Sequence, residues 1–174
     1  LNVKNSSVGI FITGNTGAVN GDITINAEDS GNGIYVKNLG TVYTNNTKIN
    51  INGTSAKGLV LENTSADNTG IFSQLTSSGN ITVKNNGIIN VNSSLGTGIY
   101  ASSENTGGVL LGTTTVDNDG TITLGSSSDV NSDSQIGIFG TAGTKINNNS
   151  VINGGSNVIG IYGTDTITTN GSIV

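Results

Sequence analysis

The stretch GIYGTDTITTNGSI, residues 160–173, contains the two motifs whose repetition decides the fold. The first motif is the Gly-Ile-Tyr at its start. The second runs from Ile167 to Ile173 and reads as an aliphatic residue, two polar residues, Asn or Asp, Gly or Ser, any residue, and Ile. Both motifs recur along the whole chain, which is typical of a protein built from stacked repeats.

The first motif marks where each repeat begins. Six of the seven aromatic residues directly follow a Gly-Ile dipeptide, namely Phe11, Tyr35, Phe72, Tyr100, Phe139 and Tyr162. The repeats begin at a Gly followed by an aliphatic residue, at Gly9, Gly33, Gly58, Gly98, Gly137 and Gly160. These starts lie 24, 25, 40, 39 and 23 residues apart. The spacing indicates a unit of about 24 residues that carries insertions in some copies.

The second motif divides each repeat into strands. Its copies are residues 17–23, 43–49, 83–89, 116–122, 146–152 and 167–173. Each unit is predicted to contain three short strands: the Gly-Ile-aromatic segment, the segment that ends at the Asn-Gly, and the segment that begins at the closing Ile. Ile, Val and Thr favour strands. We expect the Asn-Gly pair to supply a positive φ at a tight corner.

Stacking of the units gives the fold class. A unit of three short strands cannot bury its own apolar side, whereas units stacked in register can. The sequence therefore predicts an all-β fold, a parallel β-helix (solenoid) of about six coils, roughly 24 residues per coil and three short strands per coil. Residues 1–174 are expected to form a single β-helix segment without terminal caps.

The alternation of residues predicts which side chains face the interior. One inward column is expected at Ile10, Ile34, Leu59, Ile99, Ile138 and Ile161. By the same parity the glycine and the aromatic residue on either side of each Ile point outward. The rings would then form an exposed ladder of Phe11, Tyr35, Tyr100, Phe139 and Tyr162. A bend after the Ile would turn the rings inward instead, and the sequence leaves both orientations open. Stacked Asn residues in the turns are expected to hydrogen-bond from coil to coil.

The composition excludes several classes of protein. The 174 residues carry a net charge of −5 and contain no Cys and no His. Disulfide scaffolds and Cys-ligated metal modules are therefore ruled out. Six cations and an acidic pI near 4.3 disfavour nucleic acid as a partner. Without His, Cys or Arg most catalytic arrangements are missing, so we expect a protein that is no enzyme and uses no cofactor.

Three insertions depart from the repeat, at about residues 62–78, 102–113 and 126–135. The first two are expected to leave the solenoid at the same corner of adjacent coils, and insertions on one face often form a binding surface. The candidate ligand contacts are Ile71, Phe72, Leu75, Glu104 and Leu110. The alternative is a small satellite core, in which the apolar residues merely hold the loops against the solenoid.

The third insertion contains a weak candidate for a metal site. Asp129, Asn131 and Asp133 alternate as at the start of a calcium-binding loop. The loop has no Gly at its sixth position and no Glu at its twelfth. The competing interpretation is a solvated acidic turn without a metal.

Two segments carry a resemblance to a known family. Residues 155–162, GSNVIGIY, and residues 117–124, DNDGTITL, resemble the repeats of bacterial autotransporter passenger domains. The similarity is greatest to the large fusobacterial adhesins of this type V secretion class. The resemblance implies a right-handed β-helical stalk that is secreted to the bacterial cell surface. There it would be anchored by the outer-membrane β-barrel of a longer parent chain, of which these residues form an interior piece.

The resemblance and the repeat together lead to two hypotheses of function. In the first, the segment is an adhesin stalk that presents loops to a host or bacterial surface protein or glycan, a role linked to cell adhesion and virulence. The alternative is a self-assembling extracellular filament, or a surface-layer component, whose coils stack end to end. A carbohydrate-active enzyme is a third possibility, and it would require an acidic pair that the scattered carboxylates do not supply.

Overall fold

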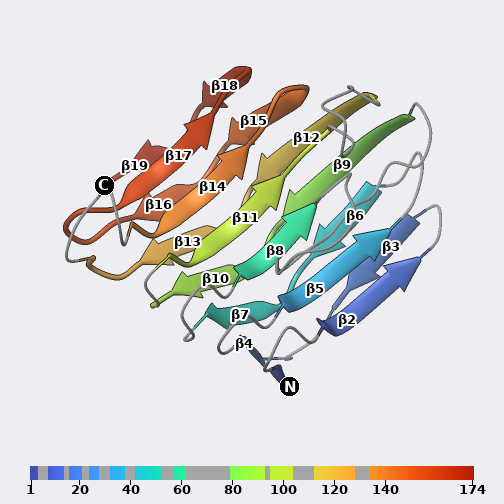
Figure 1. Cartoon of the computed structure of the whole chain (residues 1–174), viewed down its shortest axis with the longest axis horizontal. Coiled ribbons are helices and arrows are strands. Elements are labelled where there is room, and N and C mark those ends of the chain that lie inside the picture. The colour runs from blue at the N-terminus through green and yellow to red at the C-terminus, as the bar shows by residue number, and fades with distance from the viewer. Residues whose placement is uncertain are drawn as a thin grey trace.

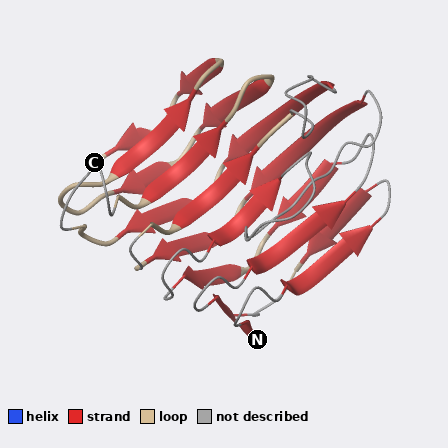
Figure 2. Ribbon diagram, in the orientation of Figure 1, coloured by secondary structure: helices blue, strands red, loops and turns tan. Residues whose placement is uncertain are grey.

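The computed structural model describes residues 1–3, 8–13, 16–20, 24–27, 32–37, 42–51, 57–61, 79–92, 95–103, 112–127 and 134–174. In these ranges the regular secondary structure consists of β-strands, joined by turns and loops (Figure 2). The predicted all-β fold is confirmed.

The described strands form three parallel sheets, and consecutive strands along the chain belong to different sheets. Sheet A has the spatial order β1 (Asn2–Val3), β4 (Thr24–Ala27), β7 (Lys48–Ile51), β10 (Ile88–Val91), β13 (Thr121–Leu124), β16 (Val151–Asn153) and β19 (Ser172–Ile173). Sheet B has the order β2 (Val8–Thr13), β5 (Asn32–Lys37), β8 (Lys57–Leu61), β11 (Thr97–Ala101), β14 (Ile136–Gly140) and β17 (Ile159–Gly163). Sheet C has the order β3 (Thr16–Val19), β6 (Val42–Asn45), β9 (Gly79–Asn85), β12 (Gly112–Asn118), β15 (Thr144–Asn148) and β18 (Thr166–Thr169).

The path of the chain follows directly from this order. The chain visits sheet A, sheet B and sheet C in turn, and each strand pairs in parallel with the strand three places further on. Figure 1 shows the strands of each sheet advancing from blue at the N-terminus to red at the C-terminus. The arrangement contains the predicted three strands per unit and is compatible with a parallel β-helix.

The strand register confirms the repeat marked by the first motif. Ile10, Ile34, Leu59, Ile99, Ile138 and Ile161 occupy one line across sheet B. Ile34, Ile99 and Ile138 are fully buried, and the two outermost members, Ile10 and Ile161, pack partly buried against the core. The predicted inward column is therefore confirmed where its side chains are described. Burial of one such side chain contributes roughly 1.5–3 kcal/mol.

Isoleucines of sheet A form the longest line of the core. Ile25, Ile49, Ile89, Ile122 and Ile152 lie in register and are fully buried. Sheet C adds Val83, Val116 and Ile146 from the second motif. One continuous apolar core thus lies between the three sheets.

The register corrects the prediction for the first copy of the second motif. The motif placed Ile23 opposite Ile49, whereas in the structure Ile25 pairs with Ile49. Residues 20–23 connect β3 to β4, while only residues 46–47 connect β6 to β7. The first connection is two residues longer, and a shift of two residues leaves the same face of the strand inward. Ile23 itself lies outside the described residues.

The glycine of the first motif faces inward, which the parity argument did not predict. Gly98 and Gly137 are buried. A Cβ atom on Gly98 would lie 2.6 Å from the carbonyl oxygen of Gly137 and 3.5 Å from Cγ2 of Ile122 and of Ile89. Glycine is therefore required because the neighbouring strand and the side chains of sheet A leave no space for a Cβ.

The glycine of the Asn-Gly turn also has a different role from the predicted one. Among the described residues the positive φ angles belong to Leu95, Asn157, Gly112 and Gly143, and none belongs to an Asn-Gly turn. A Cβ on Gly120 would instead lie 2.1 Å from the carbonyl oxygen of Gly87 in the neighbouring strand connection. Glycine is needed at these turn positions because successive turns stack too closely for a Cβ atom, and not because the backbone has a positive φ angle.

The close stacking brings two donors onto one carbonyl group. The N–H groups of Asp119 and Gly120 both donate to the carbonyl of Asn85, at 2.9 and 2.6 Å. The same double bond to one carbonyl occurs at the turns of residues 86–87 and 170–171. Where Ser150 replaces the glycine, the preceding residue, Asn149, still donates to the equivalent carbonyl, at 2.9 Å, and the second bond is missing.

We predict that Gly120→Ala destabilises the protein by about 1–3 kcal/mol, because the new methyl group must displace the backbone of the neighbouring turn. The measurement is urea unfolding followed by far-ultraviolet circular dichroism. Ser150→Ala, at the equivalent turn position, is the matched control and should change stability by less than about 0.5 kcal/mol. Equal effects of the two substitutions would contradict the close-stacking explanation.

Candidate functional site

Most of the predicted contact residues lie outside the described residues. This holds for the whole insertion 62–78, for residues 104–111 of the second insertion and for residues 128–133 of the third. The predicted ligand contacts Ile71, Phe72, Leu75, Glu104 and Leu110 are among them, as are the metal candidates Asp129, Asn131 and Asp133. These assignments remain predictions from the sequence.

The attachment of the first two insertions is described. Residues 62–78 connect β8 to β9, and residues 102–111 connect β11 to β12. β8 and β11 are neighbours in sheet B, and β9 and β12 are neighbours in sheet C. Both insertions therefore cross from sheet B to sheet C in adjacent units. We call this part of the molecule the loop edge.

A buried network of hydroxyl groups holds the base of the second insertion. The N–H of Thr114 donates to Oγ of Ser103 at 2.8 Å, and the hydroxyl of Ser103 donates to the carbonyl of Gly143 at 3.0 Å. The hydroxyl of Thr114 donates to the carbonyl of Ser102 at 3.2 Å. Ser102, Ser103 and Thr114 are all buried. The two ends of the insertion are thus bonded to each other and to the next unit.

The same network makes the inserted segment shorter than the predicted range of residues 102–113, because the residues at both ends of that range belong to the scaffold. Ser102 also accepts a hydrogen bond from the hydroxyl of Thr141, with the two Oγ atoms 2.9 Å apart. At the other end Gly112 and Thr113 belong to β12. Only residues 104–111 thus lie beyond the bonded base, which fixes where this segment leaves the scaffold.

The aromatic residues of the first motif share one line of the register in sheet B. The line contains Phe11, Tyr35, Val60, Tyr100, Phe139 and Tyr162. The rings of Tyr100 and Phe139 stack at 5.0 Å with 12° between their planes, and those of Phe139 and Tyr162 stack at 5.1 Å with 5°. Tyr100 and Phe139 are half-buried, whereas Tyr162 is 47% exposed. For Phe11 and Tyr35 the structure describes the backbone pairing of β2 with β5, and their side chains lie outside the described part.

This geometry assigns the ladder a structural role. A sugar ring binds an aromatic side chain over its face, and in this stack each face between Tyr100 and Tyr162 is covered by the neighbouring ring. Each stacked pair contributes about 0.5–1.5 kcal/mol beyond the buried area. The covered faces therefore support the stacking of units and are closed to a glycan.

A ladder of buried amides runs through sheet C at the last residues of its strands, beside the turns in which the sequence predicted stacked Asn. Nδ2 of Asn45 donates to Oδ1 of Asn85 at 2.9 Å, Asn85 donates to Asn118 at 2.8 Å, and Asn118 donates to Asn148 at 2.8 Å. The ladder ends where Asn148 donates to the hydroxyl of Thr169 at 3.3 Å. The four Asn side chains are fully buried. Buried amides are stable only when bonded, so this inner ladder fixes the register of the units.

A second, exposed ladder follows the turn residues that come directly after the inner ladder. Asn46 donates to Asn20, and Asn86 donates to Asn46 at 3.0 Å. Further along, Asn149 donates to Asp119 at 3.0 Å and Asn170 donates to Asn149 at 3.1 Å. The direction of donation is toward the N-terminus in this outer ladder and toward the C-terminus in the inner one. The sequence pattern predicted ladders but not their directions.

One buried polar atom lacks a partner and was not anticipated from the sequence. The side chain of Gln135 is 2% exposed, and its Oε1 has no hydrogen-bond partner. The backbone N–H of Gln135 donates to Oγ of Ser127 at 3.3 Å. An unbonded buried amide oxygen costs about 1–3 kcal/mol. This cost lies at the C-terminal base of the third insertion.

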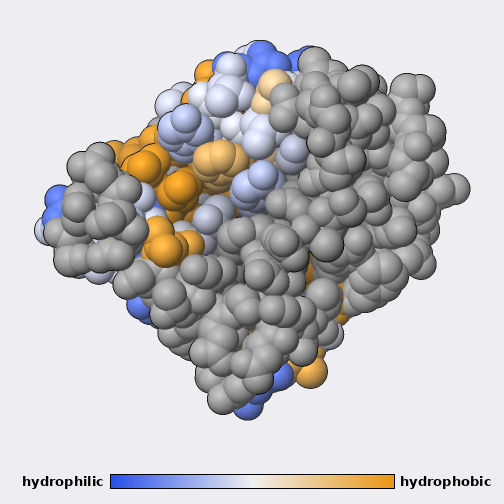
Figure 3. Space-filling view, in the orientation of Figure 1, coloured by the Kyte–Doolittle hydropathy of each residue, from blue (hydrophilic) through white to orange (hydrophobic). Residues whose placement is uncertain are grey.

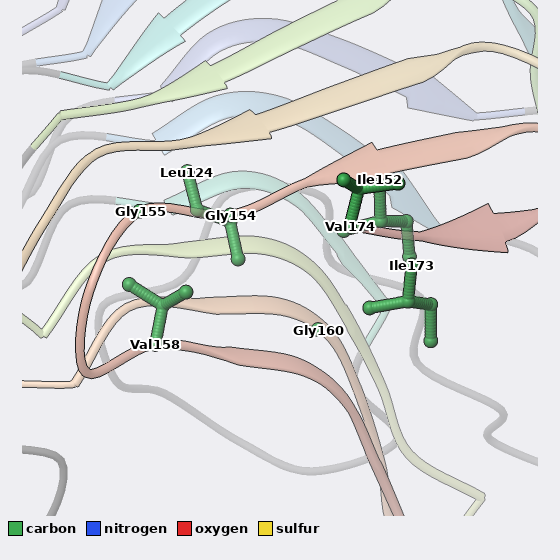
Figure 4. A pocket seen from close by; sticks show the side chains of 8 residues that line it. All are labelled: Leu124, Ile152, Gly154, Gly155, Val158, Gly160, Ile173 and Val174. Atoms are coloured by element: carbon green, nitrogen blue, oxygen red, sulfur yellow. The ribbon is translucent and has the colours of Figure 1, made fainter.

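An apolar hollow of about 190 Å³ lies at the C-terminal side of the core. Its lining residues are Leu124, Ile152, Gly154, Gly155, Val158, Gly160, Ile173 and Val174 (Figure 4). Figure 3 shows hydrophobic surface gathered over the C-terminal strands, beside more polar surface. The lining residues described for the hollow have no titratable side chains.

Within the described ranges, no three His, Cys, Asp or Glu side chains gather where they could hold a metal ion. The described residues also contain no helix with the length and hydrophobicity needed to cross a membrane.

Comparison with known proteins gave no relative. No protein-family model matches the sequence, no curated protein matches it, and no solved structure matches the fold.

We predict that Asn85→Ala and Asn86→Ala, at adjacent positions, have very different effects. The first leaves buried amide groups of Asn45 and Asn118 without their partner and should cost about 2–4 kcal/mol. The second removes an exposed bond and should cost less than about 0.5 kcal/mol. Urea unfolding of the two variants gives the comparison, and similar midpoints would show that the inner ladder is not the main source of register.

We predict that Gln135→Met leaves stability unchanged or raises it by up to about 1 kcal/mol. The substitution removes an unpaired buried oxygen and keeps a side chain of similar length. Thermal unfolding of the variant beside the natural chain is the measurement. A clear loss of stability would mean that Oε1 accepts a bond from a bound water or ion in solution.

Proposed function

We propose that the chain is a segment of a secreted, right-handed parallel β-helix that acts as an adhesin stalk on the bacterial cell surface. It would consist of about six coils of roughly 24 residues, as in an autotransporter passenger anchored through the outer membrane. Its role is to hold binding loops away from the cell, and it catalyses no reaction. Its partner is a surface protein or glycan of a host or bacterial cell.

The main support for the proposal comes from the loop edge, where both insertions connect neighbouring strands of sheets B and C. The strands that flank the two insertions pair along their whole length, from Gly79 opposite Gly112 to Asn85 opposite Asn118. The insertions therefore leave the scaffold from adjacent strands. Binding residues are found disproportionately on loops that a rigid scaffold positions.

The bonding between units supports a mechanical role. The described residues contain no cysteine, so stability comes from noncovalent contacts that repeat from unit to unit. Parallel strand pairing, the buried isoleucine lines and the inner amide ladder all act in the same direction, along the stack of units. In such a solenoid each unit is stabilised by its neighbours, and length can be extended by adding units.

The composition of the two insertions supports a binding role. The predicted contacts Ile71, Phe72, Leu75 and Leu110 are apolar, and Glu104 supplies a charge beside them. Apolar anchors with polar neighbours are typical of surfaces that bind proteins.

We predict that binding to host-cell or bacterial surfaces depends on the loop edge. In the test variant, residues 62–78 and 104–111 are replaced by short turns, and the Ser103–Thr114 base is kept intact. Binding of labelled chain to cells and to immobilised glycans should fall at least tenfold. The matched control shortens residues 128–133, which connect sheet A to sheet B and leave from a different edge.

The control variant should bind like the natural chain, and circular dichroism establishes that both variants remain folded. Equal loss of binding in the two variants would move the site away from the loop edge. If the natural chain binds no surface at all, the segment is a spacer and not an adhesive tip.

A further inference from the structure

The turns between sheet C and sheet A contain a dipeptide that is chemically reactive. Asn86-Gly87 lies between β9 and β10, and Asn170-Gly171 lies between β18 and β19. In a flexible chain an Asn that precedes Gly is prone to spontaneous loss of its side-chain amide, because glycine has no side chain to shield its backbone nitrogen. These turns are therefore candidate sites of chemical modification.

The modification uses the backbone nitrogen of the glycine as its nucleophile. This nitrogen gives up its proton and attacks Cγ of the asparagine. A new C–N bond forms, the bond between Cγ and Nδ2 breaks, and Nδ2 leaves with the proton as ammonia. The product is a five-membered succinimide ring, which water opens to aspartate or isoaspartate. The reaction therefore requires a glycine nitrogen without a hydrogen bond and an asparagine amide that can rotate toward it.

Both requirements are blocked in the turn of residues 86–87. The N–H of Gly87 donates to the carbonyl of Asn45 at 3.0 Å, so the attacking nitrogen is bonded to the neighbouring unit. Nδ2 of Asn86, the leaving group, donates to Oδ1 of Asn46 at 3.0 Å. The nucleophile and the leaving group are thus held by two successive residues of the same neighbouring turn. We call this pair of bonds the turn lock.

The turn lock recurs in the turn of residues 170–171. The N–H of Gly171 donates to the carbonyl of Asn148 at 3.0 Å. Nδ2 of Asn170 donates to Oδ1 of Asn149 at 3.1 Å. The two Asn-Gly turns belong to different units, so the same bonds arise from the repeat and not from a local accident of one turn.

The stacked turns also leave no space for the product. In isoaspartate the main chain runs through the side chain and is longer by one carbon atom. A Cβ atom on Gly87 would already lie 2.0 Å from the carbonyl oxygen of Thr47, and one on Gly171 would lie 1.9 Å from that of Ser150. A turn packed too closely for one methyl group has no room for a longer backbone.

We propose that the stacking of units protects these Asn-Gly pairs from deamidation, so that each pair reacts only while its own turn is open. The rate in the folded protein is then the rate in an unstructured chain multiplied by the fraction of time that the turn lock is broken. This inference goes beyond the adhesin proposal and does not depend on it, because the turn lock needs only the stacked units.

The test measures loss of the Asn86 amide by mass spectrometry at neutral pH and body temperature. The folded 174-residue chain is compared with the same chain in urea and with a synthetic peptide of residues 83–89. The folded chain should lose the amide at least about tenfold more slowly than the peptide, because the turn is rarely open. Hydrogen exchange of the Gly87 N–H should be slowed by about the same factor, since both reactions need the same bond to break. Equal rates of deamidation in the folded chain and the peptide would overturn the proposal.

A local substitution separates protection by the turn from protection by the fold as a whole. Asn85→Ala removes the buried amide that bonds Asn45 and Asn118 beside this turn. Deamidation of Asn86 should become at least about tenfold faster, whereas that of Asn170, in a distant turn, should keep its rate in the natural chain. Equal acceleration at the two sites would mean that only global unfolding exposes them, and the proposal would be wrong.

A milder substitution guards against an Asn85→Ala variant that fails to fold. Asn46→Ala removes the exposed acceptor of the Asn86 amide and should accelerate deamidation there about twofold, with no change at Asn170. Asn50→Ala is the matched control, because it removes the amide that accepts from Asn90 within sheet A and leaves the turn lock intact. It should change neither rate. An equal effect of the two substitutions on Asn86 would contradict the turn lock.

Discussion

The buried amide ladder is the interaction on which the rest of the structure depends. Each Asn of the ladder is fully buried, so its amide must find both a donor and an acceptor within the protein. Asn85 and Asn118 find them in the Asn of the units before and after, at 2.8–2.9 Å. At the two ends of the ladder, Asn45 accepts from the hydroxyl of Thr47 and Asn148 donates to that of Thr169. The backbone carbonyl of the same Asn85 also receives two N–H groups from the next turn. A slip by one residue would break both sets of bonds, whereas the apolar core tolerates exchange of one aliphatic residue for another.

This constraint explains why glycine and asparagine occur together in the second motif. The turn of the next unit must approach the carbonyl of the inner-ladder Asn closely, and a side chain at the glycine two positions after that Asn would collide with the turn of the neighbouring unit. Ser150 shows the consequence of a departure from the rule, because one of the two bonds to the Asn118 carbonyl is lost there. The core contributes most of the stabilisation by burial, and the polar turns determine how the units align.

Sequence periodicity predicted much of this fold, for physical reasons that differ between elements. The isoleucine lines and the three strands per unit could be predicted because burial forces alternation along a strand. The inward orientation of Gly98 could not, since a glycine leaves no hydrophobic signal and its burial depends on a bend in the backbone. The closing residue of the first unit was placed two positions early, at Ile23, because a longer connection keeps the same alternation and so leaves the pattern unchanged.

The unbonded Oε1 of Gln135 has no counterpart in the sequence pattern. The predicted loop contacts were argued from insertions alone, and an insertion identifies a position in the repeat without showing the conformation of the loop.

The opposite directions of the two ladders have an electrical consequence. Amide groups that donate in a row align their dipoles, as peptide groups do in an α-helix, and the aligned row places partial charges of opposite sign at its two ends. In this molecule the inner ladder donates toward the C-terminus and the outer ladder toward the N-terminus. Their dipoles oppose each other over the units in which both rows consist of amides, whereas the Asp119 carboxylate, which accepts and cannot donate, interrupts the outer row. Where both rows are complete, an added unit lengthens them together, so the axial field of the side-chain amides does not accumulate with length.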